Sequence, residues 1–272
     1  MKKKRLIPVV LLRNGWLVQS KEFKRHQNIG NPTSSVKRFS EWESDELIYL
    51  NISNNDTFDM RRDDLRHPNH SSLLDILTDV SKVTFMPITI GGGIRNLSDI
   101  QKRLSLCADK VSINTQALND PNFIYNASRE FGSQCIIVSV DAKRVDNKYF
   151  VTSDGGKVIT KIEVKEWVKK IEDLGAGEIL INSVDRDGMK TGYDIELLDN
   201  VANSVNLPVI ALGGVGELSH FADALSQTKV DAIAAANIFQ YVDQSVFLAK
   251  NYLVEKGFNI RKIFNNKTSK NE

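Results

Sequence analysis

Short apolar segments rich in strand-forming residues alternate with amphipathic helical segments along the chain, and this alternation constrains the fold more than any other feature. The apolar segments are residues 6–12, 47–52, 86–90, 110–113, 135–140, 178–184, 209–212 and 231–235. They are almost continuously apolar, as expected for parallel strands that helices cover. Helical periodicity is clearest in residues 99–106, 162–174 and 195–205. Eight such units in 272 residues predict one closed (βα)8 barrel of the α/β class, although a doubly wound open sheet shows the same alternation.

The second half of the chain repeats motifs of the first half. Segment 92–98 (GGIRNLS) matches segment 213–219 (GGVGELS), and Asp231 follows the second motif at a similar offset to Asp109 after the first. This repeat is too long for a solenoid period. It predicts two fused half-barrels, about residues 1–130 and 131–264, with two equivalent ligand sites at one barrel mouth.

Three segments fall outside the repeated units. Residues 17–32 form a long polar stretch after the first strand and are a candidate flexible lid. Residues 143–160 are typical of a small hairpin excursion around Asp154, Gly155 and Gly156. The polar residues 265–272 are expected to be a disordered tail.

Composition excludes several classes of function. The net charge of +2 gives no reason to expect nucleic acid or an anionic membrane as a partner. The first apolar segment is too short for a membrane span and lacks a signal-peptide cleavage site, so we expect a cytoplasmic protein. Cys107, Cys135 and the four histidines lack the spacing of a metal site or a disulfide framework. We therefore predict no metal and no cofactor.

Two glycine loops are candidate phosphate sites. Residues 91–93 and 213–214 each follow a strand and precede a helix, and the first helix has Asn96 or Ser98 as its expected N-cap. Glycines at such turns let backbone N–H groups approach an anion, and the helix N-terminus favours negative charge. Tight turns without a ligand would also use glycine. Residues that could complete the two sites end the fourth and eighth strands: Asn114, Thr115, Ala236 and Asn237.

Carboxylates at the ends of two strands are candidate catalytic groups. Asp141 ends the fifth strand, where it could act as a general acid or base, or could simply pair with Lys143 or Arg144. Asp185 and Asp187 follow the sixth strand and could either cap the turn or bind a ligand hydroxyl. Leu11 occupies the position equivalent to Asp141 in the first half of the chain. The mouth therefore offers one carboxylate where a symmetric site would have two.

Charged residues also begin, or directly precede, four of the predicted strands. They are Arg5, Glu46, Lys110 and Glu178. On their own, charges at strand starts are usually solvated or form ordinary surface salt bridges.

Several motifs together resemble the cyclase subunit of imidazole glycerol phosphate synthase. They are segments 109–115 (DKVSINT), 140–144 (VDAKR), 175–180 (GAGEIL) and 183–188 (SVDRDG), with both glycine loops in register. The resemblance covers about residues 5–261. It implies a barrel of two half-barrels with two phosphate sites, and a glutaminase subunit docked as a heterodimer at the opposite face. It also implies that ammonia crosses the barrel to a bis-phosphorylated ribonucleotide.

The resemblance assigns roles residue by residue. Asp141 matches one of two catalytic aspartates. One phosphate site matches Gly93, Asn114 and Thr115. The other phosphate site matches Asp187, Gly188, Gly214, Ala236 and Asn237. The charged gate at the entrance of the ammonia passage matches Arg5, Glu46, Lys110 and Glu178.

Departures from the family pattern lie mainly at the mouth. Leu11 stands where the family has its other catalytic aspartate, Gln19 replaces a lid lysine, and Asn51 replaces a second-strand aspartate. Leu212 and Asn237 each replace a serine. A leucine cannot exchange a proton, and losing one such group lowers rates by a factor of about 10² to 10⁴. The gate residues, in contrast, are all present.

Three functions remain open on the sequence. The pattern favours a paralogue from surface-polysaccharide pathways, in which the barrel passes ammonia toward an N-acetyl sugar that becomes an acetamidino sugar. Such a barrel acts with a glutaminase subunit and a third, amidotransferase-like enzyme. The first alternative is a working cyclase of histidine biosynthesis that tolerates Leu11. The second is a non-catalytic scaffold that activates the glutaminase.

Overall fold

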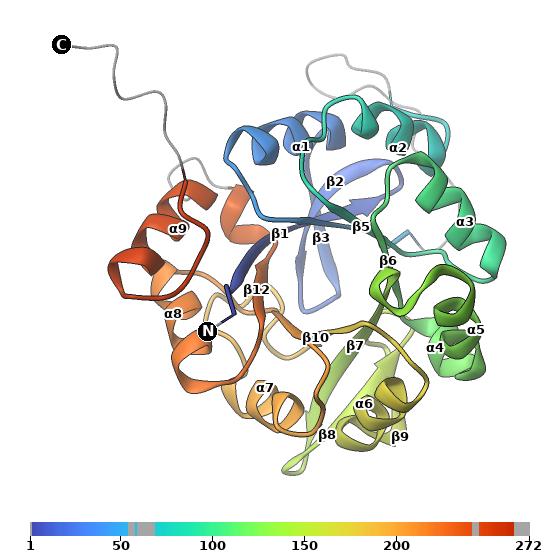
Figure 1. Ribbon diagram of the computed structural model, residues 1–272, viewed down its shortest axis with the longest axis vertical. Helices are drawn as coiled ribbons and strands as arrows, with labels where there is room; N and C mark the ends of the chain where they lie inside the picture. The colour runs from blue at the N-terminus through green and yellow to red at the C-terminus, as the bar shows by residue number, and fades with distance from the viewer. Residues whose placement is uncertain (1, 54–57, 59–68, 241–244, 264–272) are drawn as a thin grey trace.

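Parallel strands close into a barrel whose hydrogen-bonded order returns to its starting strand (Figure 1). The computed structural model describes residues 2–53, 58, 69–240 and 245–263. In spatial order the barrel strands are β1 (Arg5–Arg13), β4 (Leu47–Asn51), β5 (Ile88–Gly91), β6 (Lys110–Ile113), β7 (Ile136–Val145), β10 (Glu178–Ser183), β11 (Val209–Leu212) and β12 (Ala232–Ala235). β12 pairs with β1, so the sheet has no open edge at this seam. The predicted closed barrel is confirmed, and the open sheet is excluded.

Helices form the outer layer around this barrel in Figure 1. They are α1 (Pro32–Glu41), α2 (Leu73–Ser81), α3 (Leu97–Leu106), α4 (Thr115–Asn119), α5 (Asn122–Phe131), α6 (Val164–Asp173), α7 (Ile195–Ala202), α8 (Leu218–Gln227) and α9 (Val246–Glu255), with short 3-10 turns η1 (Ser133–Cys135) and η2 (Asn237–Gln240). Asn96 is the N-cap of α3, because its side chain accepts from the Asp99 N–H at 2.9 Å. Among the described helices, none has the length and apolar character needed to cross a bilayer.

The barrel strands are buried on both faces, which explains their continuous apolar sequence. Outward side chains of the strands, such as Tyr49, pack with helix side chains such as Phe221 in the layer between strands and helices. Inward side chains form a separate cluster inside the barrel, here called the inner cluster. Its members are Ile7, Val9, Ile48, Ile137, Leu180, Ile210, Leu212, Ala232 and Ala234. Strands exposed on one face would alternate apolar and polar residues. The continuous apolar runs in the sequence therefore already indicated that both faces of the barrel strands are buried.

Two hairpins extend the barrel strands. The predicted excursion after β7 is present, because β7 continues into β8 (Lys148–Ser153) and β9 (Val158–Glu163). Residues 17–32, expected to be a lid, mostly form a second hairpin from β2 (Trp16–Lys21) and β3 (Arg25–Gly30). β2 pairs with the end of β1, and Trp16, Leu17 and Val18 are buried. The sequence did not predict these strands, since only their first residues are apolar.

Two predictions about the organisation of the chain concern its tail and its division into half-barrels. Residues 265–272, expected to be a disordered tail, lie outside the described residues. The division into half-barrels near residue 130 stays a prediction.

A buried ion pair ties the last helix to the first strands. The Lys250 ammonium donates to Asp45 Oδ1 and to the Glu43 carbonyl oxygen, each at 2.6 Å. The other oxygen of Asp45 accepts from the Leu6 N–H at 3.0 Å. Burial lowers the pKa of Lys250, and the Asp45 carboxylate opposes that shift. The pair therefore fixes α9 against the beginnings of β1 and β4.

Replacing Lys250 with Ala should destabilise the protein by about 3–5 kcal/mol, because it leaves the Asp45 carboxylate buried without its cation. Urea unfolding monitored by circular dichroism measures the change. Lys82→Ala is the matched control, since the Lys82–Asp79 pair lies at the surface and should contribute less than about 1 kcal/mol. Equal effects of the two substitutions would contradict the structural role of Lys250.

Candidate functional site

Asp141 lies at the carboxyl ends of the barrel strands between two amide side chains. Its Oδ2 accepts from Asn114 Nδ2 at 2.7 Å, and its Oδ1 accepts from Asn182 Nδ2 at 3.3 Å. The two asparagines come from β10 and from the end of β6, which flank β7 on either side. Burial raises the pKa of Asp141 to about 6, against the lowering effect of both amides. At neutral pH the group is thus a buried carboxylate that can accept a proton.

The strand opposite Asp141 offers no second carboxylate. β1 and β7 are separated by three strands in either direction around the closed barrel, so they face each other across it. Leu11 on β1 packs against the inner cluster, as Leu50 and Ala236 do. One side of the mouth is therefore acidic and the other is apolar.

Asn182 is a site residue that sequence analysis missed. It is the one uncharged amide within the apolar strand β10, two residues after the inward-facing Leu180. Side chains two apart on a strand share a face. This spacing was the available signal, because it places a polar group inside the barrel.

Both glycine loops have backbone conformations that favour glycine. The φ angles are 91° at Gly92, 65° at Gly93 and 98° at Gly214. A Cβ atom at Gly92 would lie 1.9 Å from the Asn51 carbonyl oxygen, and one at Gly214 would lie 2.1 Å from the Gly192 carbonyl oxygen. Packing alone thus requires glycine at these two positions. At Gly93 a Cβ would meet only Arg103, at 3.6 Å, so space beside this loop remains for a ligand.

The predicted residues of the second phosphate site gather around the β2–β3 hairpin. Asp187 accepts from the Ser20 hydroxyl at 2.7 Å and from the Phe23 N–H at 3.0 Å, while Asn237 donates to the Ser20 carbonyl oxygen at 2.9 Å. A Cβ at Gly188 would lie 2.4 Å from the same carbonyl oxygen. The Asp187 carboxylate is therefore engaged by the hairpin, and its charge would repel a phosphate.

The remaining predicted phosphate residues take different positions. Asn114 lies within this site through its bond to Asp141, and Thr115 is exposed at the start of α4. Ala236 follows β12 and packs against the inner cluster. Asn114 was predicted as a phosphate residue, but in the structure its side chain contacts Asp141.

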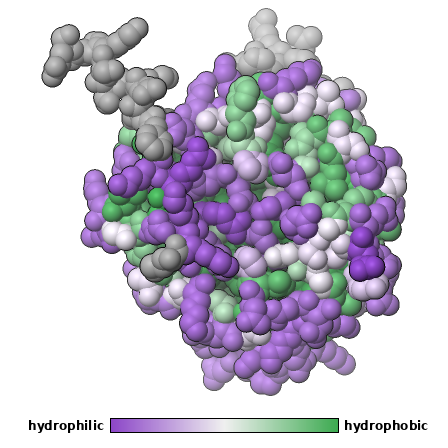
Figure 2. Space-filling model, viewed as in Figure 1, coloured by the Kyte–Doolittle hydropathy of each residue, from purple (hydrophilic) through white to green (hydrophobic). Residues whose placement is uncertain are grey.

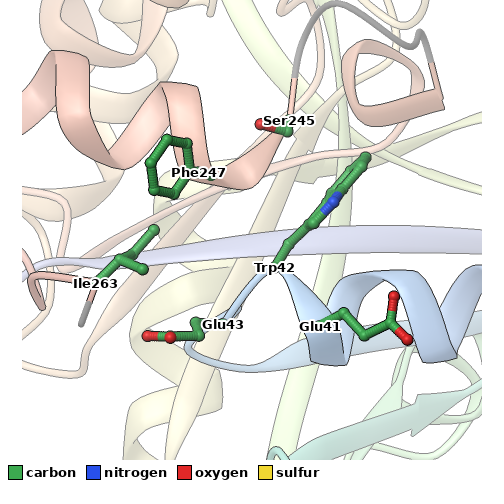
Figure 3. A pocket seen from close by; sticks show the side chains of 6 residues that line it. All are labelled: Glu41, Trp42, Glu43, Ser245, Phe247 and Ile263. Carbon is green, nitrogen blue, oxygen red and sulfur yellow. The ribbon is translucent and has the colours of Figure 1, made fainter. Parts of the chain in front are cut away.

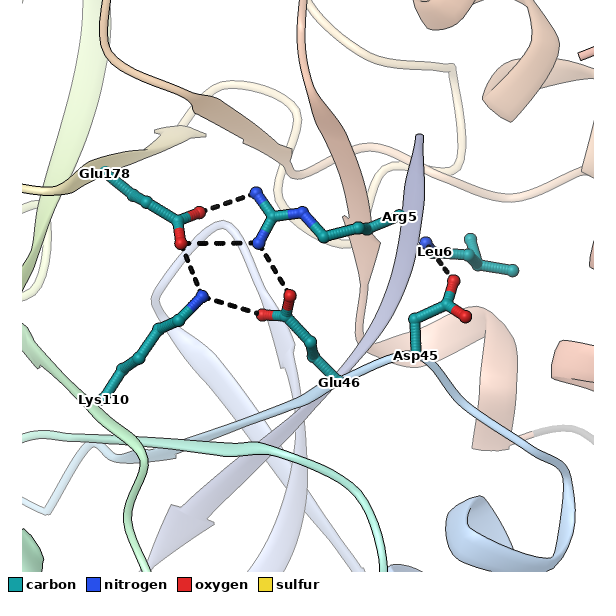
Figure 4. A network of polar contacts seen from close by, with 6 residues as sticks. All are labelled: Arg5, Leu6, Asp45, Glu46, Lys110 and Glu178. Atoms are coloured by element: carbon teal, nitrogen blue, oxygen red, sulfur yellow. Dashed lines mark hydrogen bonds and ion pairs between the residues drawn. The ribbon is translucent and has the colours of Figure 1, made fainter. Parts of the chain in front are cut away.

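The four predicted gate residues form a closed ring of alternating charge at the other end of the barrel (Figure 4). Arg5 contacts Glu46 at 2.7 Å and Glu178 at 2.6 Å, and Lys110 contacts the same glutamates at 3.3 Å and 2.5 Å. Burial lowers the pKa of Arg5, but hydrogen bonds and charges from both glutamates outweigh it and raise that pKa. Burial likewise raises the pKa of Glu178, and the two cations outweigh it and lower that pKa. Each charge has two partners, unlike those of a solvated rim.

A cavity between α1 and α9 lies apart from this site (Figure 3). It has a volume of about 250 Å³ and is lined by Glu41, Trp42, Glu43, Ser245, Phe247 and Ile263. None of these residues comes from the strand ends that carry Asp141 or the glycine loops. Over the described residues, no three His, Cys, Asp or Glu side chains are arranged to hold a metal ion.

The sequence profile of the Histidine biosynthesis protein family matches residues 5–244. The chain belongs to this family. It is 40% identical over 259 residues to the imidazole glycerol phosphate synthase subunit HisF of Hydrogenobaculum sp. (strain Y04AAS1), covering 95% of this chain and 98% of the relative. It is 41% identical over 263 residues to the subunit HisF of Staphylococcus carnosus (strain TM300), covering 96% and 99%.

A third relative carries a different subunit name. A Vibrio vulnificus (strain YJ016) protein provisionally named imidazole glycerol phosphate synthase subunit hisF2 is 42% identical over 261 residues, covering 96% of this chain and 92% of the relative. The resemblance to the cyclase subunit is thus confirmed at the level of the family. No relative named here connects the family to surface polysaccharides, so the relatives favour the imidazole glycerol phosphate synthase alternative.

The raised pKa of Asp141 predicts how stability depends on pH. Between about pH 4 and pH 6 the folded protein retains a proton on Asp141 that the unfolded chain releases. Stability should therefore fall as pH rises through this window, by up to about 3 kcal/mol. Asp141→Asn should remove this part of the slope in urea unfolding at a series of pH values. Asp185→Asn, at an exposed position of the neighbouring loop, is the control and should keep the wild-type slope. A wild-type slope in Asp141→Asn would contradict the assignment.

Proposed function

We propose that this chain is the cyclase-type subunit of an imidazole glycerol phosphate synthase. In this proposal a glutaminase subunit docks on the charged ring, ammonia crosses the barrel, and a phosphorylated ribonucleotide accepts it at the mouth. The observation that carries the proposal is the pairing of a closed ring at one end of the barrel with a buried carboxylate at the other. The names of the relatives support the same reaction.

Hydroxyl groups inside the barrel support a route between these ends. Register partners on adjacent strands face the same side of a sheet, so Thr89 faces inward beside Ile48, and Ser112 beside Ile137. Ser139 is paired in the same way with Leu180. Ser112 Oγ is buried and has no hydrogen-bond partner. An ammonia molecule crossing an otherwise apolar interior needs such partners, because unpaired polar groups are costly there.

The ring supplies a gate in this proposal. When closed, each of its charges is neutralised by two opposite neighbours, so the ring excludes water without leaving an unpaired charge. A small neutral molecule passes if one ion pair opens, whereas an ammonium ion would have to lose its water shell inside the apolar barrel, which is costly. The glutaminase must therefore release ammonia directly over this face.

At the mouth, Asp141 is the proposed general base. The amides of Asn114 and Asn182 hold both of its oxygens, which fixes the carboxylate for proton transfer. The two glycine loops precede α3 and α8, so a ligand with phosphates at both ends could bind across the mouth. The space beside Gly93 supports the first of these contacts.

Leu11 supports a second candidate, in which the ammonia serves the amidation of an N-acetyl sugar. Such a barrel would need the ring and passage, but not two carboxylates at its mouth. A third, amidotransferase-like enzyme would then complete the transfer. A non-catalytic scaffold is the weakest of the three functions, because it has no use for a paired ring over the barrel end.

Cyclase assays with free ammonium and the bis-phosphorylated ribonucleotide separate these candidates. We expect turnover about 10² to 10⁴ below that of the Hydrogenobaculum relative, because one acid–base group is missing. Leu11→Asp should increase turnover, and Asp141→Asn should abolish it. Leu248→Asp, at an exposed position on α9, is the control for adding a carboxylate. No turnover in either the wild type or Leu11→Asp would favour sugar amidation, while turnover equal to the relative would show that Leu11 is tolerated.

Lys110→Ala tests the gate in the complex with the glutaminase. Removing this cation leaves Glu46 and Glu178 each with one partner, so the ring no longer closes. Ammonia should then leak, and the ratio of glutamate released to acceptor aminated should rise, while the glutaminase still binds. Lys169→Ala, on the exposed surface of α6, should keep the wild-type ratio. An unchanged ratio in Lys110→Ala would contradict the gate and leave the ring as an ordinary group of surface salt bridges.

A further inference from the structure

Phe85 is almost completely exposed to solvent. Its exposed fraction is 91%, whereas the next most exposed large hydrophobic side chain among the described residues, Tyr125, has 52%. Phe85 lies in the segment between α2 and β5, directly before the buried Met86. A side chain this exposed buries little apolar surface against the described residues, and exposed apolar surface that gathers in a patch commonly marks a contact with another molecule.

Phe85 stands beside the charged ring. β5 lies between β4 and β6, and the ring residue Glu46 directly precedes β4 while Lys110 begins β6. The chain just after Phe85 is held there, because the Pro87 carbonyl oxygen accepts from the Leu47 N–H at 2.9 Å. Phe85 is therefore at the ring end of the barrel, immediately outside the ring.

Two more exposed apolar residues lie at this end of the barrel. Pro87 is exposed and lies two residues after Phe85, beyond a bend at Met86. Leu106, at the end of α3 and just before β6, is 37% exposed. We call Phe85, Pro87 and Leu106 the β5 patch. Figure 2, seen with the strand starts toward the viewer, shows a hydrophilic centre on this face and hydrophobic surface beside it, over α2 and α3.

We propose that the β5 patch, with Phe85 as its anchor, is the apolar contact through which the glutaminase subunit docks. This inference rests on the proposed function, because it names the contact surface for that partner. Phe85 would insert into an apolar pocket on the glutaminase, next to the opening from which ammonia is released.

The ring cannot supply most of the affinity by itself. Its charges already pair with one another, and covering charged groups removes water at a cost that roughly cancels the attraction gained. Binding energy in protein interfaces is concentrated in a few buried side chains, with large aromatic residues prominent among them. The ring thus sets the alignment over the passage, and the adjacent aromatic side chain holds the partner there.

A glutaminase fits this surface better than a second copy of the chain. Two copies joined at this face would place one closed ring against another, and neither would supply ammonia. The patch is also off-centre with respect to the ring. A partner that covers both must therefore be wide enough to span the ring, which agrees with a folded subunit rather than a short peptide.

Titration calorimetry with the glutaminase subunit from the same organism tests the contact. Phe85→Ala should weaken the affinity at least about 30-fold, because it removes an anchor side chain. Leu106→Ala should have a smaller effect. Tyr125→Ala is the matched control, since it truncates another exposed aromatic side chain, on α5 in the outer layer, and should change the affinity less than about twofold.

The outcomes separate this inference from the proposed function. If the wild-type chain does not bind the glutaminase, the proposed function fails. If the wild type binds and Phe85→Ala binds equally well, the inference fails and the function stands. Sedimentation of the chain alone gives the third outcome: a dimer that Phe85→Ala dissociates would assign the patch to self-association and overturn the inference. Urea unfolding of Phe85→Ala should match the wild type, so that lost affinity reflects the lost contact.

Discussion

The pairing of β1 with β12 is the contact on which the site depends. It brings the first strand of the chain beside the last, and the closure that results sets the distances at both ends of the barrel. Arg5 reaches Glu46 and Glu178 only because β1 lies between β4 on one side and the second half of the barrel on the other. The same closure puts Leu11 across the barrel from Asp141. Hydrogen bonds of the backbone, rather than any side chain, thus determine which functional groups meet.

Buried charges are compensated in different ways at the two ends of the barrel. At the ring, four charges of alternating sign neutralise one another, so the group as a whole carries no net charge. At the mouth, the Asp141 carboxylate is buried and accepts hydrogen bonds from two amides, which carry only partial charges. Partial charges do not offset desolvation fully, and the pKa of Asp141 remains raised as a result. The ring end therefore has no net charge, whereas the mouth holds Asp141, whose pKa lies close to the pH of a cell.

Local sequence patterns predicted the barrel well and its long-range contacts poorly. Neighbouring residues predict the strands at 110–113 and 209–212, and they narrow the N-cap of α3 to Asn96 or Ser98, of which the structure has Asn96. The ring was found because a family resemblance connected four distant charges. Nothing local indicates that Lys250 pairs with Asp45, or that Asn182 faces Asp141, since these contacts join residues 205 and 41 positions apart. The β2–β3 hairpin was missed for a related reason: two of the residues that hold it, Asp187 and Asn237, follow other strands.

That hairpin makes the two glycine loops unequal, although the sequence repeats them. Space is open beside Gly93, whereas Asp187, Gly188 and Asn237 near the second loop are occupied by Ser20 and Phe23. In the proposed function, a molecule with a phosphate at each end would meet two different surroundings. One phosphate would lie beside an open loop, and the other beside a hairpin that residues of other strands hold in place. An internal repeat that is symmetric in sequence would therefore give a mouth that distinguishes the two ends of its ligand.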